Sequence, residues 1–147
     1  MRNIFNPFIV AFAGFSSLAL VTSCSKEARQ EAAAESAVES VVDVTEDYCE
    51  LLESIKDKDS AKAAITKMDG LADKYAKVAG KAKKAGDTPP DAATVAKTEE
   101  QMKPLQDRMV KAATSAMPII ATDPELVKAF QEKQTLIATK MQEAAAK

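Results

Sequence analysis

Apolar residues recur at helical spacing along four stretches of this sequence, and this periodicity constrains the fold more than any other feature. When successive residues are placed about 100° apart, each stretch gathers its apolar side chains on one face and leaves the other polar. The four faces lie within residues 38–55, 61–82, 98–120 and 126–144. Strand patterns are absent, and good helix formers such as alanine, glutamate and lysine dominate these stretches. We therefore predict an all-α fold.

Three polar breaks, at residues 56–60, 86–90 and 118–124, separate the four stretches. Thr88 and Thr122 are each followed by proline and an acid, a pattern in which the threonine hydroxyl caps the next helix. Gly86 supplies a residue that adopts the left-handed conformation at the end of the second helix. Because the breaks are short, consecutive helices should run antiparallel. The expected architecture is an antiparallel up-down four-helix bundle.

Three residues inside the predicted helices oppose regular helix formation. Gly70 and Gly80 lie on the outer side of the second helix, where each costs about 1 kcal/mol relative to alanine. Pro104 lies off the apolar face of the third helix and should kink it, because proline lacks the backbone N–H of a helical hydrogen bond. Alanine-rich faces also bury little apolar area, so a modest core is expected.

The N-terminus has the layout of a secretory signal, with Arg2 followed by an uncharged stretch whose apolar part spans residues 8–21. The segment ends in Val21-Thr22-Ser23-Cys24. This tetrapeptide resembles the lipobox of bacterial lipoproteins, with valine where leucine is usual. The resemblance implies cleavage between Ser23 and Cys24, and attachment of a diacylglyceryl group and further acyl chains such as palmitate to Cys24.

Two other interpretations of this segment remain open. It is compatible with an ordinary signal peptide in which Cys24 is incidental, and with an uncleaved membrane anchor, because about 20 uncharged residues just span a bilayer. All three interpretations place the rest of the chain outside the cytoplasm. We expect a signal peptide at residues 1–23, a lipidated tether at 24–36 and the helical bundle at 37–147, facing the periplasm or the exterior of a bacterial cell envelope.

Charge is unevenly distributed between the first two predicted helices. Residues 31–53 hold eight acids and no basic residue, whereas residues 56–84 hold nine lysines and four aspartates. The two helices are expected to pair across the bundle. An additional interpretation concerns a stripe opposite the apolar face of the second helix, formed by Lys74, Lys77, Lys81 and Lys84. Such a stripe suits contact with anionic lipid headgroups or an anionic cell-wall polymer.

The composition excludes several kinds of functional site. The chain has no histidine, which removes imidazole-based catalysis and most zinc and copper sites. Cys49 lies on an apolar face, where we expect a buried hydrophobe; an intermolecular disulfide is the alternative. Met102, Met109 and Met117 do not converge on one point, so core packing is expected rather than copper binding. We expect neither a metal nor a cofactor.

These observations favour a non-catalytic protein over an enzyme. We expect an envelope-anchored lipoprotein with a structural, scaffolding or binding role, attached to the membrane through Cys24 and contacting an unidentified envelope protein. Nucleic acid is not an expected partner, since no aromatic residues are interleaved with the lysines. The alternative function is a carrier of a small apolar ligand, held in a cavity between alanine-lined helices.

Overall fold

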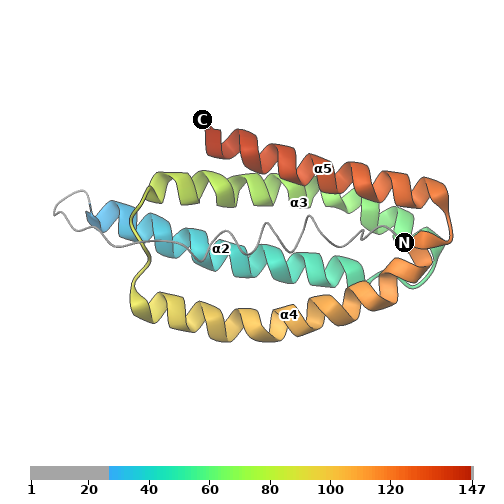
Figure 1. The fold of residues 1–147 in the computed structure, drawn as a ribbon, viewed down its shortest axis with the longest axis horizontal. Coiled ribbons are helices and arrows are strands. Elements are labelled where there is room, and N and C mark those ends of the chain that lie inside the picture. The colour runs from blue at the N-terminus through green and yellow to red at the C-terminus, as the bar shows by residue number, and fades with distance from the viewer. Residues whose placement is uncertain (1–26, 147) are drawn as a thin grey trace.

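A computed structural model describes residues 27–146, which form four α-helices and no strand. The helices are α2 (Glu27–Glu53), α3 (Lys58–Ala85), α4 (Ala92–Ala121) and α5 (Pro124–Ala146). The connections between consecutive helices lie at alternate ends of the molecule (Figure 1). The all-α prediction is confirmed for this part of the chain, whereas Ser23 and Cys24 lie outside the described residues.

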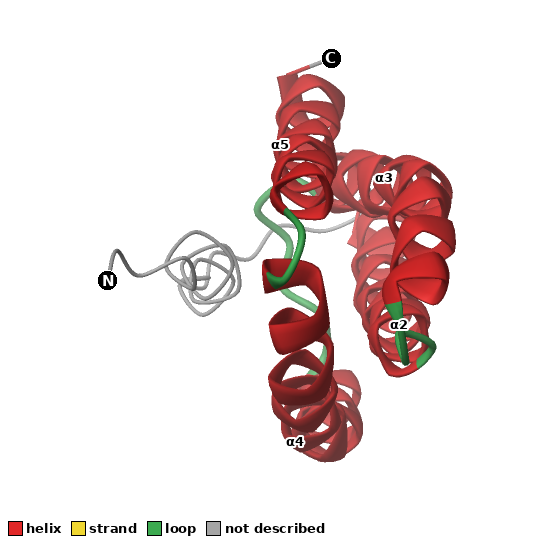
Figure 2. Ribbon diagram, turned by 90° about the vertical axis from the view of Figure 1, so that its right-hand side faces the viewer, coloured by secondary structure: helices red, strands yellow, loops and turns green. Residues whose placement is uncertain are grey.

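The helices pack in the order α5, α3, α2, α4, which differs from their order in the sequence. α2 packs against α3 and α4, and α3 packs against α2 and α5, while α4 and α5 touch each other little. Seen from the end, the four helices form a curved row with α4 and α5 at its two ends (Figure 2). The main neighbour of α4 is thus α2 rather than α3, the helix that precedes it in the sequence.

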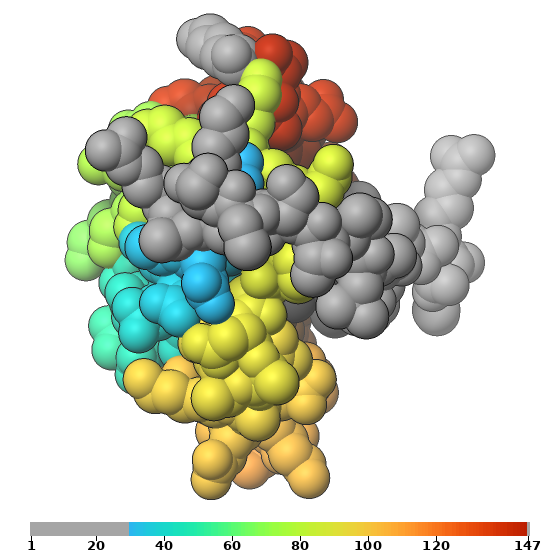
Figure 3. All heavy atoms as spheres, turned by 90° about the vertical axis from the view of Figure 1, so that its left-hand side faces the viewer, coloured from blue at the N-terminus to red at the C-terminus, as the bar shows by residue number. Residues whose placement is uncertain are grey.

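The connection between α3 and α4 accounts for this order. It spans residues 86–91 and passes the beginning of α2, where the Thr88 hydroxyl donates a hydrogen bond to Gln30 Oε1 at 3.1 Å. Figure 3 shows the first turns of α2, in blue, beside the start of α4, in yellow. The connection therefore carries the chain across the end of α2, and α4 continues along the far side of that helix.

Buried residues in α2 and α3 follow a seven-residue repeat, alternating steps of three and four. In α3 the repeat is formed by Ala61, Ala64, Met68, Leu71, Tyr75 and Val78. In α2 and the turn that follows it, the repeat is formed by Ala34, Ala37, the half-buried Val41, Val44, Tyr48, Leu51 and Ile55. This spacing is that of two long helices packed side by side, as in coiled coils. The pair α2–α3 is the centre of the fold.

The sequence predicts a single apolar face for α2 that includes Val41, Thr45, Tyr48 and Leu52, and the buried residues Val44 and Leu51 lie outside it. α2 also buries Thr45, Cys49 and Leu52 on a second line of residues. Since α2 lies between α3 and α4, its buried surface is wider than the face of a helix with a single neighbour. One apolar face placed midway between the two sets of buried residues therefore omits part of the surface that faces α3.

The predicted caps of α4 and α5 need correction. α4 begins after Asp91, whose side chain accepts a hydrogen bond of 2.6 Å from the Thr94 N–H, rather than after Thr88. The reason is Pro90: a residue that precedes proline is driven out of the helical region, so Pro89 cannot be the first helical residue after Thr88. Thr122 closes the end of α4, and its hydroxyl donates to the Ile119 carbonyl at 2.7 Å.

The third break is shorter than expected. Pro118 lies inside α4, which continues to Ala121, and α5 begins at Pro124. Asp123 accepts a hydrogen bond from the Glu125 N–H at 3.0 Å and so caps α5 in place of Thr122. Pro118 is exposed, so the carbonyl that loses its helical partner four residues earlier faces the solvent side.

Several other predicted features are confirmed. Gly86 has a positive φ of 62° and ends α3. Gly70 and Gly80 lie inside α3, and a Cβ added at either would meet no other atom within 4 Å. Pro104 lies inside α4 and is exposed. The glycines are therefore not needed for close helix packing.

The helical part begins earlier than residue 37, the expected start of the bundle. α2 starts at Glu27. Ala34 and Ala37 are both only 4% exposed. The expected tether comprises residues 24–36, and its second half is therefore part of a packed helix. Its sequence shows no conventional apolar face because the residues that pack are small alanines.

Candidate functional site

The lysine stripe predicted on α3 lies closer to α2 than the sequence indicates. Lys74 Nζ forms an ion pair of 2.6 Å with Asp47 Oδ2, and Lys81 Nζ donates a hydrogen bond of 2.7 Å to Ser40 Oγ. Lys74 and Lys81 therefore lean toward α2, although the Lys74 side chain remains exposed. Lys77 and Lys84 are exposed and form no ion pair with any residue in the described range.

A fifth lysine belongs to the same surface. Lys67 precedes Lys74 by seven residues, and both lysines line a cleft between α2 and α3. The stripe predicted from the sequence does not include Lys67. Seven residues fall about 20° short of two full helical turns, so Lys67 lies about 20° outside the edge of the stripe that Lys74 forms. The repeat 67, 74, 81 is the signal that identifies it. We call Lys67, Lys74, Lys77, Lys81 and Lys84 the lysine face.

Acids next to the lysine face on α3 are already neutralised by α5. Both carboxylate oxygens of Asp69 lie 2.7 Å from Lys133 Nζ. Asp73 Oδ1 lies 2.5 Å from Lys140 Nζ, which holds the pKa of Asp73 below its usual range. Because lysines of α5 occupy these acids, the lysines of α3 do not pair with them, and the outward charge of α3 stays positive.

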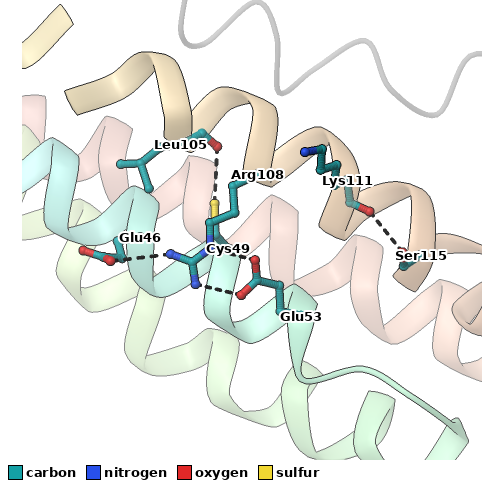
Figure 4. A network of polar contacts seen from close by, with 7 residues as sticks. All are labelled: Glu46, Cys49, Glu53, Leu105, Arg108, Lys111 and Ser115. Carbon is teal, nitrogen blue, oxygen red and sulfur yellow. Dashed lines mark hydrogen bonds and ion pairs between the residues drawn. The ribbon is translucent and has the colours of Figure 1, made fainter. Parts of the chain in front are cut away.

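The acids of α2 divide between two neighbours, so the prediction that they pair with α3 holds only in part. Asp47 pairs with α3, but Glu46 and Glu53 pair with Arg108 of α4 (Figure 4). Arg108 Nε and Nη2 each donate a hydrogen bond of 2.7 Å to one oxygen of Glu53. This bidentate contact holds the pKa of Glu53 below its usual range. Glu39 adds a weaker pair with Lys97 at 3.9 Å.

Cys49 is a buried, unreactive thiol. Its side chain is 0% exposed and free, and its Sγ donates a hydrogen bond to the Leu105 carbonyl at 3.6 Å. Burial raises the pKa of the Cys49 thiol, which disfavours the nucleophilic thiolate. The expectation of a buried hydrophobe is confirmed, and the lack of exposure argues against an intermolecular disulfide.

The methionines of α4 pack in the interior as predicted. Met102 is buried, whereas Met109 and Met117 are half-buried against the hydrophobic core. Across residues 27–146 no cluster of histidine, cysteine, aspartate and glutamate side chains suited to a metal ion is present. The burial of the three methionine side chains against the core makes them packing groups.

Two tyrosines lie in the core between α2 and α3. Burial raises the pKa of Tyr48 to about 12, and the hydroxyl of Tyr48 forms a hydrogen bond with Gln134 of α5. Burial raises the pKa of Tyr75 further. Within the described part of the chain, the buried Tyr75 hydroxyl has no hydrogen-bond partner. An unpartnered buried hydroxyl is unfavourable, so this group is a point of low stability in the core.

A cleft of about 440 Å³ lies on the outer side of the α2–α3 pair. Its lining residues are Asp47, Glu50, Leu51 and Ser54 of α2 and Lys67, Gly70, Leu71 and Lys74 of α3. The cleft is open to solvent, and side chains of both charges line it. Two of the five lysines of the lysine face, Lys67 and Lys74, therefore border a groove in which acids of α2 are close neighbours.

Within residues 27–146, no helix combines the length and hydropathy that crossing a bilayer requires. In comparisons with known proteins, no family model, no curated protein and no solved structure matches the chain.

Proposed function

We propose that the chain is a bacterial envelope lipoprotein with a non-catalytic binding role. In this account the four helices form an antiparallel up-down assembly, an acylated Cys24 anchors it to the membrane, and the lysine face contacts anionic lipid headgroups. The observation that carries the binding role is the lysine face itself. It combines five lysines on one side of α3 with acids on the neighbouring side, Asp69 and Asp73, that already pair with α5.

The position of α2 supports a membrane-bound role. Only Ser25 and Lys26 separate Cys24 from the first residue of α2, Glu27. An acylated Cys24 thus keeps the helical body next to the bilayer. A single acyl chain gives marginal anchoring, whereas two or more chains, or one chain with a basic surface, hold a protein stably. A lysine face close to the headgroups adds to the anchoring.

The dimensions of the lysine face suit an extended anionic surface. From Lys67 to Lys84 the helix spans about 25 Å, at about 1.5 Å per residue. Each lysine close to an anionic membrane contributes about 1 kcal/mol. Lys74 and Lys81 already contact α2, so Lys77 and Lys84 should contribute most. Lipid headgroups are favoured over a wall polymer, because the tether brings the lysines to the membrane.

Co-sedimentation with vesicles tests this binding role. The protein is residues 24–147 with Cys24→Ser, which removes the acylation site and retains all of α2; circular dichroism first verifies that it is helical and unfolds cooperatively. Wild-type protein should sediment with phosphatidylglycerol vesicles at low salt and less at moderate salt. Replacing Lys74, Lys77, Lys81 and Lys84 with glutamine should weaken binding at least tenfold.

A matched variant separates the lysine face from general positive charge. It carries glutamine at four exposed lysines of α4 and α5: Lys97, Lys103, Lys111 and Lys128. This control has the same net charge as the α3 variant and should bind nearly as well as wild type. Equal losses in both variants would contradict a specific face. Binding to isolated wall polymer but not to vesicles would transfer the role to the wall.

The alternative of an apolar-ligand carrier finds less support. The described cleft between α2 and α3 is open, and four of its eight lining residues are charged. An apolar ligand favours an enclosed, mostly apolar site. We therefore retain the anionic-surface role as the proposed function.

A further inference from the structure

The cleft between α2 and α3 has two walls of opposite charge. Glu50 lies on the α2 side and Lys67 on the α3 side. Both are exposed, and neither forms an ion pair with another residue in the described range. Their neighbours Asp47 and Lys74 are bound to each other at 2.6 Å, so this second pair is internally neutral. The charges left available in the cleft are one carboxylate and one ammonium group.

Gly70 deepens the middle of this cleft. It lies in the interior of α3, where glycine is unfavourable relative to alanine. A Cβ at this position would meet no atom within 4 Å, so packing within the protein does not require glycine. The missing side chain leaves space in the cleft and exposes backbone between Lys67 and Lys74. A closely approaching ligand is a physical reason for a glycine at this position.

The floor of the cleft is apolar. Leu51 and Leu71 both line it, and each is mostly buried beneath the charged rim. A ligand in the cleft would thus have an apolar body over the two leucines and Gly70. A purely anionic ligand is disfavoured because Glu50 would repel it, and a purely cationic ligand is disfavoured because Lys67 would repel it.

We propose that the cleft binds a short zwitterionic peptide. Its ammonium group contacts Glu50, its carboxylate contacts Lys67, and its backbone lies over Gly70 and the two leucines. Charge-assisted hydrogen bonds at both ends fix the direction of the peptide. This inference shares Lys67 with the lysine face, but it requires neither membrane anchoring nor a lipid headgroup, since Lys67 here contacts the carboxylate of a peptide and Glu50 and Gly70 lie outside that face.

Selective ¹⁵N-glycine labelling of the full chain in neutral detergent tests the proposal. The sequence has four glycines, so few amide signals need assignment. Trialanine is the probe. Its addition should shift the Gly70 signal saturably and leave the Gly80 and Gly86 signals in place. N-acetyl-trialanine lacks the ammonium group and trialanine amide lacks the carboxylate, so each should bind about three- to tenfold more weakly.

Variants connect each end of the peptide to its residue. Equilibrium dialysis with labelled trialanine should show three- to tenfold weaker binding to Glu50→Gln. The same variant should bind N-acetyl-trialanine as wild type does, because the lost contact involves the ammonium group. Lys67→Gln should give the corresponding result with trialanine amide. Gly70→Ala should weaken binding, whereas Gly80→Ala, which also places a methyl group in open space on α3, should not.

Three results would overturn the inference. The first is a Gly70 signal that stays unchanged up to the solubility limit of trialanine. The second is equal binding of free and blocked peptides, which would exclude recognition of the termini. The third is wild-type affinity in Gly70→Ala with its helical content intact. Failure of vesicle binding would leave these measurements unaffected, so the two proposals fail independently.

Discussion

Arg108 Nε and Nη2 each lie 2.7 Å from a different oxygen of Glu53, so a single guanidinium joins α4 to α2 through two parallel hydrogen bonds. The third nitrogen, Nη1, lies 3.5 Å from Glu46. Figure 4 shows the three residues around Cys49 at the α2–α4 interface. Because α4 has few contacts with α3 and α5, this cluster carries much of the polar attachment of α4 to the rest of the molecule.

Arg108→Lys should lower the thermal midpoint although the charge is retained. A lysine ammonium does not reproduce the planar, two-point contact with a carboxylate. The matched control is Lys97→Gln, which removes a longer, exposed pair of 3.9 Å with Glu39 and should change the midpoint little. Thermal unfolding followed by circular dichroism measures both. An Arg108→Lys midpoint equal to that of wild type would show that the bidentate contact does not stabilise α4.

Tyr75→Phe should leave stability unchanged or raise it by up to about 1 kcal/mol, because it removes a buried hydroxyl that has no partner among the described residues. Tyr48→Phe should instead lower stability by about 1 kcal/mol, since its hydroxyl forms a hydrogen bond with Gln134. Urea unfolding of the two variants compares the same chemical change at two core positions. Equal losses in both would mean that the Tyr75 hydroxyl is satisfied in solution.

Leu52→Ala should destabilise the protein by about 2–5 kcal/mol, because truncating a buried leucine removes apolar contacts and leaves a cavity. Leu52 is 2% exposed on the line of α2 residues that packs beyond the α3-facing repeat. Val110→Ala is the control: Val110 is 66% exposed on α4, and its truncation should stay within about 0.5 kcal/mol. A small loss for Leu52→Ala would contradict burial of α2 on two sides.

Glu35→Gln should raise stability at pH 7. The hydrogen bond with Asp91, burial and neighbouring acids raise the pKa of Glu35 in the folded protein, so its ionisation opposes folding. This destabilisation is absent below the pKa of Glu35 in the unfolded chain, about 4, and is complete once the pH exceeds the pKa of Glu35 in the folded protein. The midpoint gained by Glu35→Gln should therefore shrink toward zero as the pH falls to about 3. A gain that persists at pH 3 would require another cause.

Local sequence signals predict where each helix begins and ends, but they do not predict which helices pack against each other. Gly86 and Pro124 mark a helix end and a helix start through backbone constraints that act within a few residues. Thr88 does not cap α4 because two prolines follow it, and the restriction that Pro90 imposes on Pro89 outweighs the capping preference of a hydroxyl. The packing of α4 on α2 depends on the path of residues 86–91, which no periodicity encodes.

For the candidate site, the sequence predicts which lysines are exposed but not which residues of α2 they contact. Lys77 and Lys84 are exposed as expected, because a residue opposite the apolar face of a helix faces solvent. Asp47 and Ser40 draw Lys74 and Lys81 toward α2, a contact that depends on the register of two helices. Lys67 belongs to the face only because the α2–α3 pair follows a seven-residue repeat.

The central claim is that Cys24 becomes the acylated first residue of the mature protein. Mass spectrometry of the mature chain, isolated from the membrane fraction of a bacterium that expresses the full sequence, tests it most directly. The account predicts an N-terminal peptide that begins at Cys24 and carries diacylglyceryl and acyl masses, and a Cys24→Ala variant that accumulates as the unprocessed precursor. An unmodified N-terminus at any other residue, or a retained Met1 in wild-type protein, would contradict the claim.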